Sequence, residues 1–200
     1  MNPKFILDLL KHGADVISNS DYIEMLGVAK ELNGVAKVVL SVPDILLRRK
    51  LNALLTAINL SEDERIAYLE KNSKNAEGQR KIGWALLELV NRADSTTKAE
   101  HIASLFSDYI RTGYDLELFL RYSQIINSMY ADELQYFLST EESKIDETSD
   151  LVEHLISIGV YTRTYGSIGF GNSISPQKKP TYTEAGEKIF NTLNRIKHIF

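Results

Sequence analysis

Most of this chain repeats its apolar residues at the spacing of an α-helix, and no other sequence feature constrains the fold as strongly. One clear example has apolar residues at positions i, i+4, i+7 and i+8, namely Ile82, Leu86, Leu89 and Val90. This spacing gives a helix one apolar face, which has to be buried against a neighbouring element. Residues 44–58 carry a similar amphipathic pattern. The sequence therefore predicts a mainly α fold, arranged as a multi-helix bundle.

Short polar signals indicate where some of these helices begin and end. Ser61 with Glu64 and Thr97 with Glu100 each match a capping box. In that motif a hydroxyl oxygen accepts from the third helical amide, and the carboxylate accepts from the amide of the capping residue. Gly113 fits the position just after a helix, where the left-handed backbone conformation is common.

The helical pattern also assigns positions to two aromatic residues. Trp84, the single tryptophan, lies one position from an apolar stripe, so we expect it to be buried at the edge of the core. Asp115 starts a long helix whose inner face includes Tyr130. Residues 134–138 either continue this helix or form a short successor.

The chain divides by composition into an acidic body and a mildly basic C-terminal module. Its net charge is −4, yet residues 151–200 hold six basic and three acidic residues, a net charge of +3. Residues 141–150 between the two parts contain five acids and one lysine. We therefore expect an acidic helical body at residues 1–140, an acidic linker at 141–150 and a separate module at 151–200.

The C-terminal module mixes helix and strand patterns. Residues 150–158 predict a short helix that ends at Gly159, and residues 160–165 are β-branched and aromatic, which favours a strand. Residues 180–182 can return as a second strand, and a last helix starts from Thr183. The module should therefore contain a short β-hairpin between two helices.

This order of elements resembles the C-terminal part of winged-helix domains. Many of those domains read Leu-x-x-Leu-x-x-x-Gly-Leu/Val and then Tyr-x-Leu-Thr-x-x-Gly. The matching residues are Leu151 or Val152, Leu155, Gly159, Val160, Tyr182, Thr183 and Gly186. Tyr182 stands where a leucine usually precedes the threonine. The resemblance implies a winged-helix-like module at residues 151–200, but a fold of this kind does not by itself specify a function.

Residues 151–190, with the helical pattern upstream of them, also resemble small helical bacterial proteins of the abortive-infection alpha type. Those phage-exclusion proteins have a helical body and a closing Leu-x-x-Leu-Gly-Leu/Ile and Leu-Thr-x-x-Gly segment. The resemblance implies an interaction protein of the host cytoplasm that acts during phage infection. It supplies no catalytic residues.

The charge of the helix before the hairpin bears on DNA binding. In winged-helix proteins this helix enters the major groove, so its outer face should carry basic or amide side chains. Here the polar positions are Asp150, Glu153, His154 and Ser157. Two carboxylates on that face would repel DNA phosphates. We therefore expect weak nucleic-acid binding or none.

Six cations remain candidate contacts with nucleic acid or with an acidic partner. Three lie in the hairpin region and three form a compact triplet in residues 44–58: Arg163, Lys178, Lys179, Arg48, Arg49 and Lys50. The simplest interpretation of the triplet is a solvated helix face.

No catalytic motif emerges from the reactive residue types. The chain has no cysteine, which excludes thiolate zinc sites and cysteine nucleophiles, and it has no Gly-x-Ser-x-Gly elbow. None of its four histidines stands at a metal-ligand spacing, and the Asp132–Glu133 pair fits a solvated face. We predict no catalytic residue, no cofactor, no metal and no enzyme activity; a site assembled from distant helices is the enzymatic alternative.

The most apolar stretch, residues 34–47, is too short to span a bilayer and contains Lys37 and Asp44. We therefore expect a protein without a transmembrane segment. The absence of cysteine fits a reducing compartment, so the expected location is cytoplasmic. Exposed leucines within residues 44–58 could mediate a homodimer.

The first hypothesis for the function is a non-enzymatic helical protein that acts through contacts with a protein partner, in bacterial phage defence. The alternative is a winged-helix DNA-binding transcriptional regulator.

Overall fold

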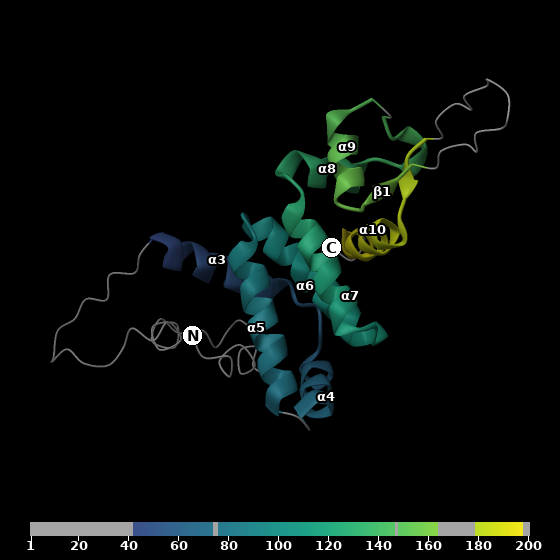
Figure 1. Cartoon of the computed structure of the whole chain (residues 1–200). Coiled ribbons are helices and arrows are strands. Elements are labelled where there is room, and N and C mark those ends of the chain that lie inside the picture. Colours follow the sequence, from purple (N-terminus) through teal and green to yellow (C-terminus); the bar gives the residue numbers. More distant parts are fainter. Residues whose placement is uncertain (1–41, 74–75, 147, 164–178, 198–200) are drawn as a thin grey trace, which may run out of the picture. The chain divides into compact units, whose positions relative to one another are not determined.

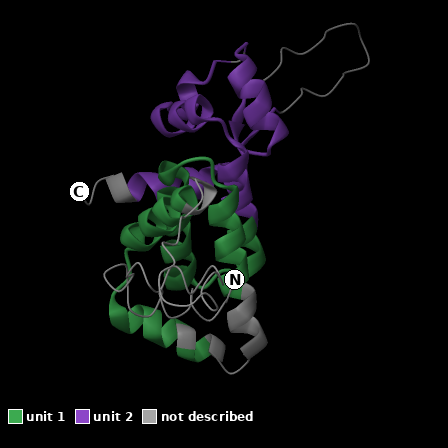
Figure 2. Cartoon of the chain, turned by 90° about the vertical axis from the view of Figure 1, so that its left-hand side faces the viewer, with its two compact units in different colours: residues 1–120 green, residues 121–200 purple. Residues whose placement is uncertain are grey.

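The computed structural model describes residues 42–73, 76–146, 148–163 and 179–197. These residues are mainly helical, with a small two-stranded antiparallel sheet near the C-terminus (Figure 1). The mainly helical prediction is therefore confirmed. The chain forms two compact units, residues 1–120 and residues 121–200 (Figure 2).

Unit 1 is built from helices that pack through their apolar faces. Its described elements are α3 (Val42–Ala57), α4 (Glu62–Ser73), α5 (Ala76–Arg92), α6 (Thr96–Thr112) and the first turn of α7 (Leu116–Ser128). Helix α3 packs on α5 and α6, and α5 also packs on α4 and α6. The side chains at the centre of this packing are almost fully enclosed, among them Leu54, Leu86, Ile102 and Leu105.

The ends of α4 and α6 show how local polar contacts set helix boundaries. The amide of Ser61 donates to Glu64 Oε2 at 2.7 Å, and the amide of Glu64 donates to Ser61 Oγ at 3.2 Å, so this capping box is confirmed. Gly113 ends α6 with φ 71°, also as expected. The start of α6 differs from the prediction. Ser95 is the N-cap, because its hydroxyl accepts from the amide of Lys98 at 3.3 Å, and Thr97 lies inside the first turn.

Two aromatic residues are more exposed to solvent than the sequence predicted. Within the described part of the chain, the Trp84 side chain on α5 is exposed, whereas we expected it to be buried at the edge of the core. Tyr130 is also exposed, because α7 ends at Ser128 and a separate helix, α8 (Ala131–Ser139), follows. The short-successor alternative is the one that the structure adopts.

In unit 2 the small sheet packs against helices. After α7 and α8 come the 3₁₀ turn η2 (Glu142–Lys144), α9 (Asp150–Ser157), β1 (Tyr161–Thr162), β2 (Thr181–Tyr182) and α10 (Glu184–Lys197). Helix α9 lies next to β1, and α10 lies next to β2. The strands pair with Tyr161 opposite Tyr182 and Thr162 opposite Thr181. The predicted order of short helix, two strands and last helix is present.

Aromatic rings from two helices and two strands pack together in the core of unit 2. Phe137 of α8 lies edge-on to the rings of Tyr161, Tyr182 and Phe190, with centroid separations of 6.2, 5.9 and 5.7 Å. Edge-to-face pairs of this kind add to the stabilisation from burial alone.

The division of the chain differs from the one expected from composition. Residues 121–140 were expected to belong to the helical body, but they lie in the same unit as residues 151–200. The expected linker, residues 141–150, also lies within that unit.

The start of α10 is fixed against the turn that follows α9. Thr183 Oγ1 donates to the carbonyl of Gly159 at 2.6 Å and accepts from the amide of Gly186 at 3.0 Å, so it caps the helix. A Cβ at Gly186 would lie 2.1 Å from the carbonyl oxygen of Val160, so glycine alone fits there. These residues belong to the set that carries the winged-helix resemblance, and the structure brings them into one junction.

Candidate functional site

Helix α9 presents an acidic outer surface, in agreement with the sequence. Val152 and Leu155 are fully buried and fix one side of the helix to unit 2. Asp150 and Glu153 are exposed on the other side. Both lie in the first turn, where negative charge interacts favourably with the helix dipole. The outward charge of this helix is therefore negative, as expected.

Arg163, one of the predicted contact residues, is engaged by this acidic helix. Its guanidinium Nη1 forms an ion pair with Glu153 Oε1. The Arg163 side chain is only 11% exposed, whereas that of Glu153 is 54% exposed. The cation is thus held against α9, and its positive charge is neutralised within the module.

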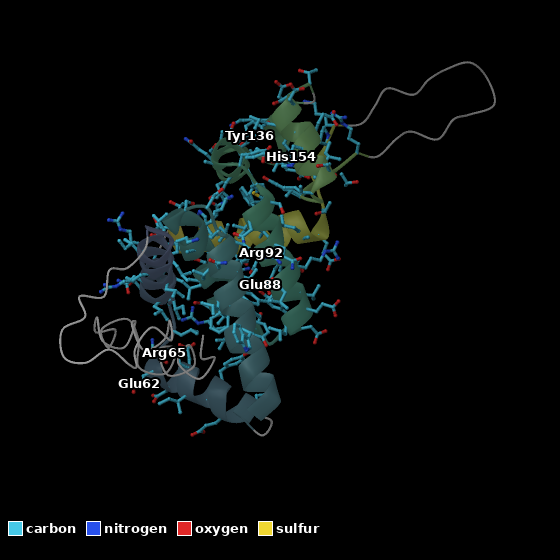
Figure 3. The ribbon with its side chains drawn as sticks, turned by 60° about the vertical axis from the view of Figure 1, so that its left-hand side comes forward. Glu62, Arg65, Glu88, Arg92, Tyr136 and His154 are labelled. Atoms are coloured by element: carbon cyan, nitrogen blue, oxygen red, sulfur yellow. The ribbon has the colours of Figure 1, made fainter. Side chains whose placement is uncertain are left out.

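A buried carboxylate holds the histidine of α9 in place. Glu133 Oε1 lies 2.6 Å from His154 Nδ1, and Glu133 Oε2 accepts from the amide of Tyr130 at 2.7 Å. The Glu133 side chain is 3% exposed and that of His154 is 35% exposed. Figure 3 labels His154 and Tyr136 in this part of the chain. Because Nδ1 faces the carboxylate, Nε2 is the ring nitrogen left for other contacts.

Tyr130 extends this cluster to the surface. Its ring lies 5.4 Å from the His154 ring with an interplanar angle of 30°, and the residue is 66% exposed. Asp150, Glu153 and His154 stand at positions i, i+3 and i+4, so they share one side of α9. We call Tyr130, Asp150, Glu153 and His154 together the α9 outer face. It combines two carboxylates with two aromatic rings. The His154 ring is held in place by its contact with the buried Glu133 carboxylate.

The other predicted cations belong to two segments of the chain, one next to β2 and one on α3. Lys179 is exposed next to β2, and Lys178 lies outside the described residues. On α3, Arg49 is exposed, and Arg48 is partly exposed and takes part in a polar interaction.

Lys50 has a structural contact that the sequence did not reveal. Its ammonium donates to the carbonyls of Asn91 and Ala93 at 2.9 and 2.7 Å, where α5 ends. Lysine at this position satisfies carbonyls that have no partner inside the helix. Burial lowers the pKa of Lys50, and the nearby Asp94 carboxylate acts in the opposite direction. The expected solvated triplet thus includes one helix cap.

Glu133 is the site residue that sequence reasoning missed, because it was assigned to a solvated face. Its partner His154 lies 21 positions away, so no local pattern pairs the two. One local signal was present: Glu133 is the third residue of α8 and accepts from the amide of the N-cap residue, which is half of a capping box. The N-cap residue is a tyrosine, so the usual serine or threonine motif is absent.

Comparison with protein-family models, with curated proteins and with solved structures found no match for this chain. Within the described ranges, His, Asp and Glu side chains do not gather in groups of three that could hold a metal ion. The described helices also lack a stretch long and apolar enough to cross a membrane. The site is therefore interpreted from its own geometry.

Proposed function

We propose that this chain is a non-enzymatic protein that acts through protein–protein contacts, with residues 151–200 as a winged-helix-like module. The observation that carries the proposal is the acidic outer face of α9. In a DNA-binding winged helix, the equivalent surface lies against phosphates. Here that surface presents Asp150 and Glu153, and the nearby Arg163 is already paired with Glu153.

The α9 outer face suits a partner with exposed arginine or lysine side chains. The exposed Asp150 carboxylate attracts such cations, whereas Glu153 is already paired with Arg163 and adds less. An exposed tyrosine ring can also accept a cation on its face. Tyrosine is also among the residues that contribute most to protein interfaces. The fixed His154 ring under Tyr130 reduces the side-chain freedom lost on binding. The partner we propose is therefore a basic protein surface.

The setting we propose is the cytoplasm of a bacterial cell during phage infection. It is supported by the resemblance of residues 151–190 to phage-exclusion proteins of the abortive-infection alpha type. The absence of cysteine fits a reducing compartment. The expectation that the chain lacks catalytic activity belongs to the same proposal.

Affinity capture with chemical cross-linking from uninfected and phage-infected bacterial cells tests this function. The wild-type chain should recover one dominant protein, and a Tyr130→Ser, Glu153→Gln variant should lose it. A variant with Glu117→Gln, an exposed carboxylate on α7, is the matched control and should retain it. Recovery of nucleic acid alone, or equal recovery by all three proteins, would overturn the proposal.

A further inference from the structure

Unit 1 contains an open cleft that the proposed function does not use. It has a volume of about 560 Å³ and lies between α4, the end of α6 and the start of α7. This volume is in the range of small-molecule sites, roughly 300–1,000 Å³. The cleft lies apart in sequence from α9 and shares no residue with the α9 outer face.

Three tyrosine rings give the cleft an aromatic lining. Tyr68 and Tyr109 meet edge-on with centroids 5.7 Å apart, and Tyr114 lies edge-on to Tyr109 at 5.5 Å. Tyr68 OH donates to Tyr109 OH at 3.1 Å, and Tyr114 OH donates to the carbonyl of Leu105 at 3.2 Å. These bonds fix the rings, so a planar ligand would meet a surface that is already ordered.

The charged residues that line the cleft include one ion pair and two further charged side chains. Arg111 Nε pairs with Glu64 Oε1 at 3.0 Å, and the same guanidinium donates to the carbonyl of Asn59. That pair neutralises itself. Lys71 on α4 and Asp115 before α7 also line the cleft, and they supply one further positive and one further negative charge from different elements.

We infer that this cleft binds an aromatic zwitterion of amino-acid to dipeptide size. The carboxylate of the ligand would face Lys71, its ammonium would face Asp115, and its ring would lie against the tyrosines. Burial raises the pKa of Tyr68, so its phenol stays neutral and acts as a hydrogen-bonding group. A ligand with one charge would leave either Lys71 or Asp115 without its complement.

Isothermal titration of the full chain with four probes tests this assignment. L-tryptophan and L-tryptophylglycine carry both charges, tryptamine lacks the carboxylate, and indole-3-propionate lacks the ammonium. At least one zwitterion should bind, and loss of either charge should weaken binding on the order of tenfold. Preference for L-tryptophan or for the dipeptide identifies the size of the ligand.

Two charge-neutralising variants locate the binding. Lys71→Gln should weaken the zwitterions and indole-3-propionate but leave tryptamine unchanged. Asp115→Asn should weaken the zwitterions and tryptamine but leave indole-3-propionate unchanged; asparagine is also an effective helix N-cap, so α7 should be retained. Lys144→Gln, at an exposed lysine in unit 2, is the control and should bind as the wild type does.

Filling the cleft provides an independent check. Ala67 is exposed on α4 and lines the cleft, so Ala67→Trp should abolish binding of every probe while far-UV circular dichroism stays unchanged. The inference is overturned if no zwitterion binds at 10 mM. It is also overturned if the singly charged probes bind equally well, or if the Lys71→Gln and Asp115→Asn variants match the wild type.

Discussion

The carboxylate of Glu133 lies 2.6 Å from Nδ1 of His154, almost fully shielded from solvent. This contact ties α8 to α9 and sets the ring on which Tyr130 rests. A hydrogen bond to a buried charged group is worth more than an average one, because an unpaired buried group has lost its hydration. The contact therefore links the stability of unit 2 to the geometry of the α9 outer face.

Glu133→Gln should lower the free energy of unfolding by about 1–3 kcal/mol. The amide can still accept from Tyr130, but it pairs less well with His154. Urea unfolding followed by circular dichroism measures the change. Glu117→Gln removes an exposed carboxylate and should shift the free energy by less than about 0.5 kcal/mol. Equal unfolding midpoints for the two variants would show that the buried Glu133–His154 contact contributes no more to the free energy of unfolding than an exposed carboxylate does.

Gly186→Ala tests the packing of α10 against the turn after α9. Helix propensity alone predicts stabilisation by about 1 kcal/mol. The close approach to Val160 predicts the opposite sign, since a Cβ would lie 2.1 Å from its carbonyl oxygen. We expect net destabilisation by about 1–3 kcal/mol, because relieving the overlap requires backbone movement.

Thermal unfolding of the Gly186→Ala variant provides the measurement for this packing. Glu187→Ala, on the exposed side of the same helix, is the matched control and should unfold close to the wild type. If Gly186→Ala were more stable than the wild type, helix propensity would outweigh packing at this junction.

Lys50→Met tests whether this lysine is a helix cap or a binding residue. Methionine keeps much of the apolar stem but cannot donate to the carbonyls of Asn91 and Ala93. We expect a loss of about 1–2 kcal/mol in the free energy of unfolding. Arg49→Met, at an exposed neighbour, should change it little. Hydrogen exchange should show faster exchange at the end of α5 in Lys50→Met alone; no difference between the two variants would remove the cap assignment.

Stability should depend on pH through Glu64. Its hydrogen bond with Arg111, followed by that with the Ser61 amide, lowers the pKa of this carboxyl from 4.5 to about 2. A pKa lowered by folding stabilises the native state above the unfolded pKa of 4.5, and this contribution is lost as pH falls toward 2. The pair is partly exposed, so its contribution should stay below about 1 kcal/mol.

Thermal unfolding of the wild type and of Glu64→Gln at pH 7, 4 and 3 checks this dependence. The wild type should be the more stable protein at pH 7, and the difference should narrow at each lower pH. A difference that is constant across the series, or one that widens toward acid, would contradict the assigned direction.

Local patterns in the sequence were enough to predict most of the secondary structure of the described residues. The Ser61–Glu64 box and Gly113 each involve residues that are close in the chain, so spacing alone identified them. The start of α6 was misplaced because Ser95 and Thr97 are both acceptable caps, and only the backbone conformation decides between them.

The candidate site was less predictable because its contacts join distant positions. Asp150 and Glu153 follow from helix spacing, and their exposure was expected. The pairs Glu133–His154 and Arg163–Glu153 arise when the chain folds back on α9, which no local motif encodes. The cap made by Lys50 has the same origin, since its acceptors lie 41 and 43 positions away.

The binding of a fluorescent mixed-sequence DNA duplex, measured by anisotropy at 50 and 200 mM salt, tests the central claim most directly. An acidic α9 outer face predicts affinity no tighter than roughly 10⁻⁴ M at 200 mM salt, the weak end of non-specific binding. It also predicts tighter binding at 50 mM salt for a variant with Asp150→Asn and Glu153→Gln, because repulsion from phosphates is removed. Tight wild-type binding with a steep salt dependence, lost on changing Arg163, Lys178 and Lys179 to glutamine, would contradict the account.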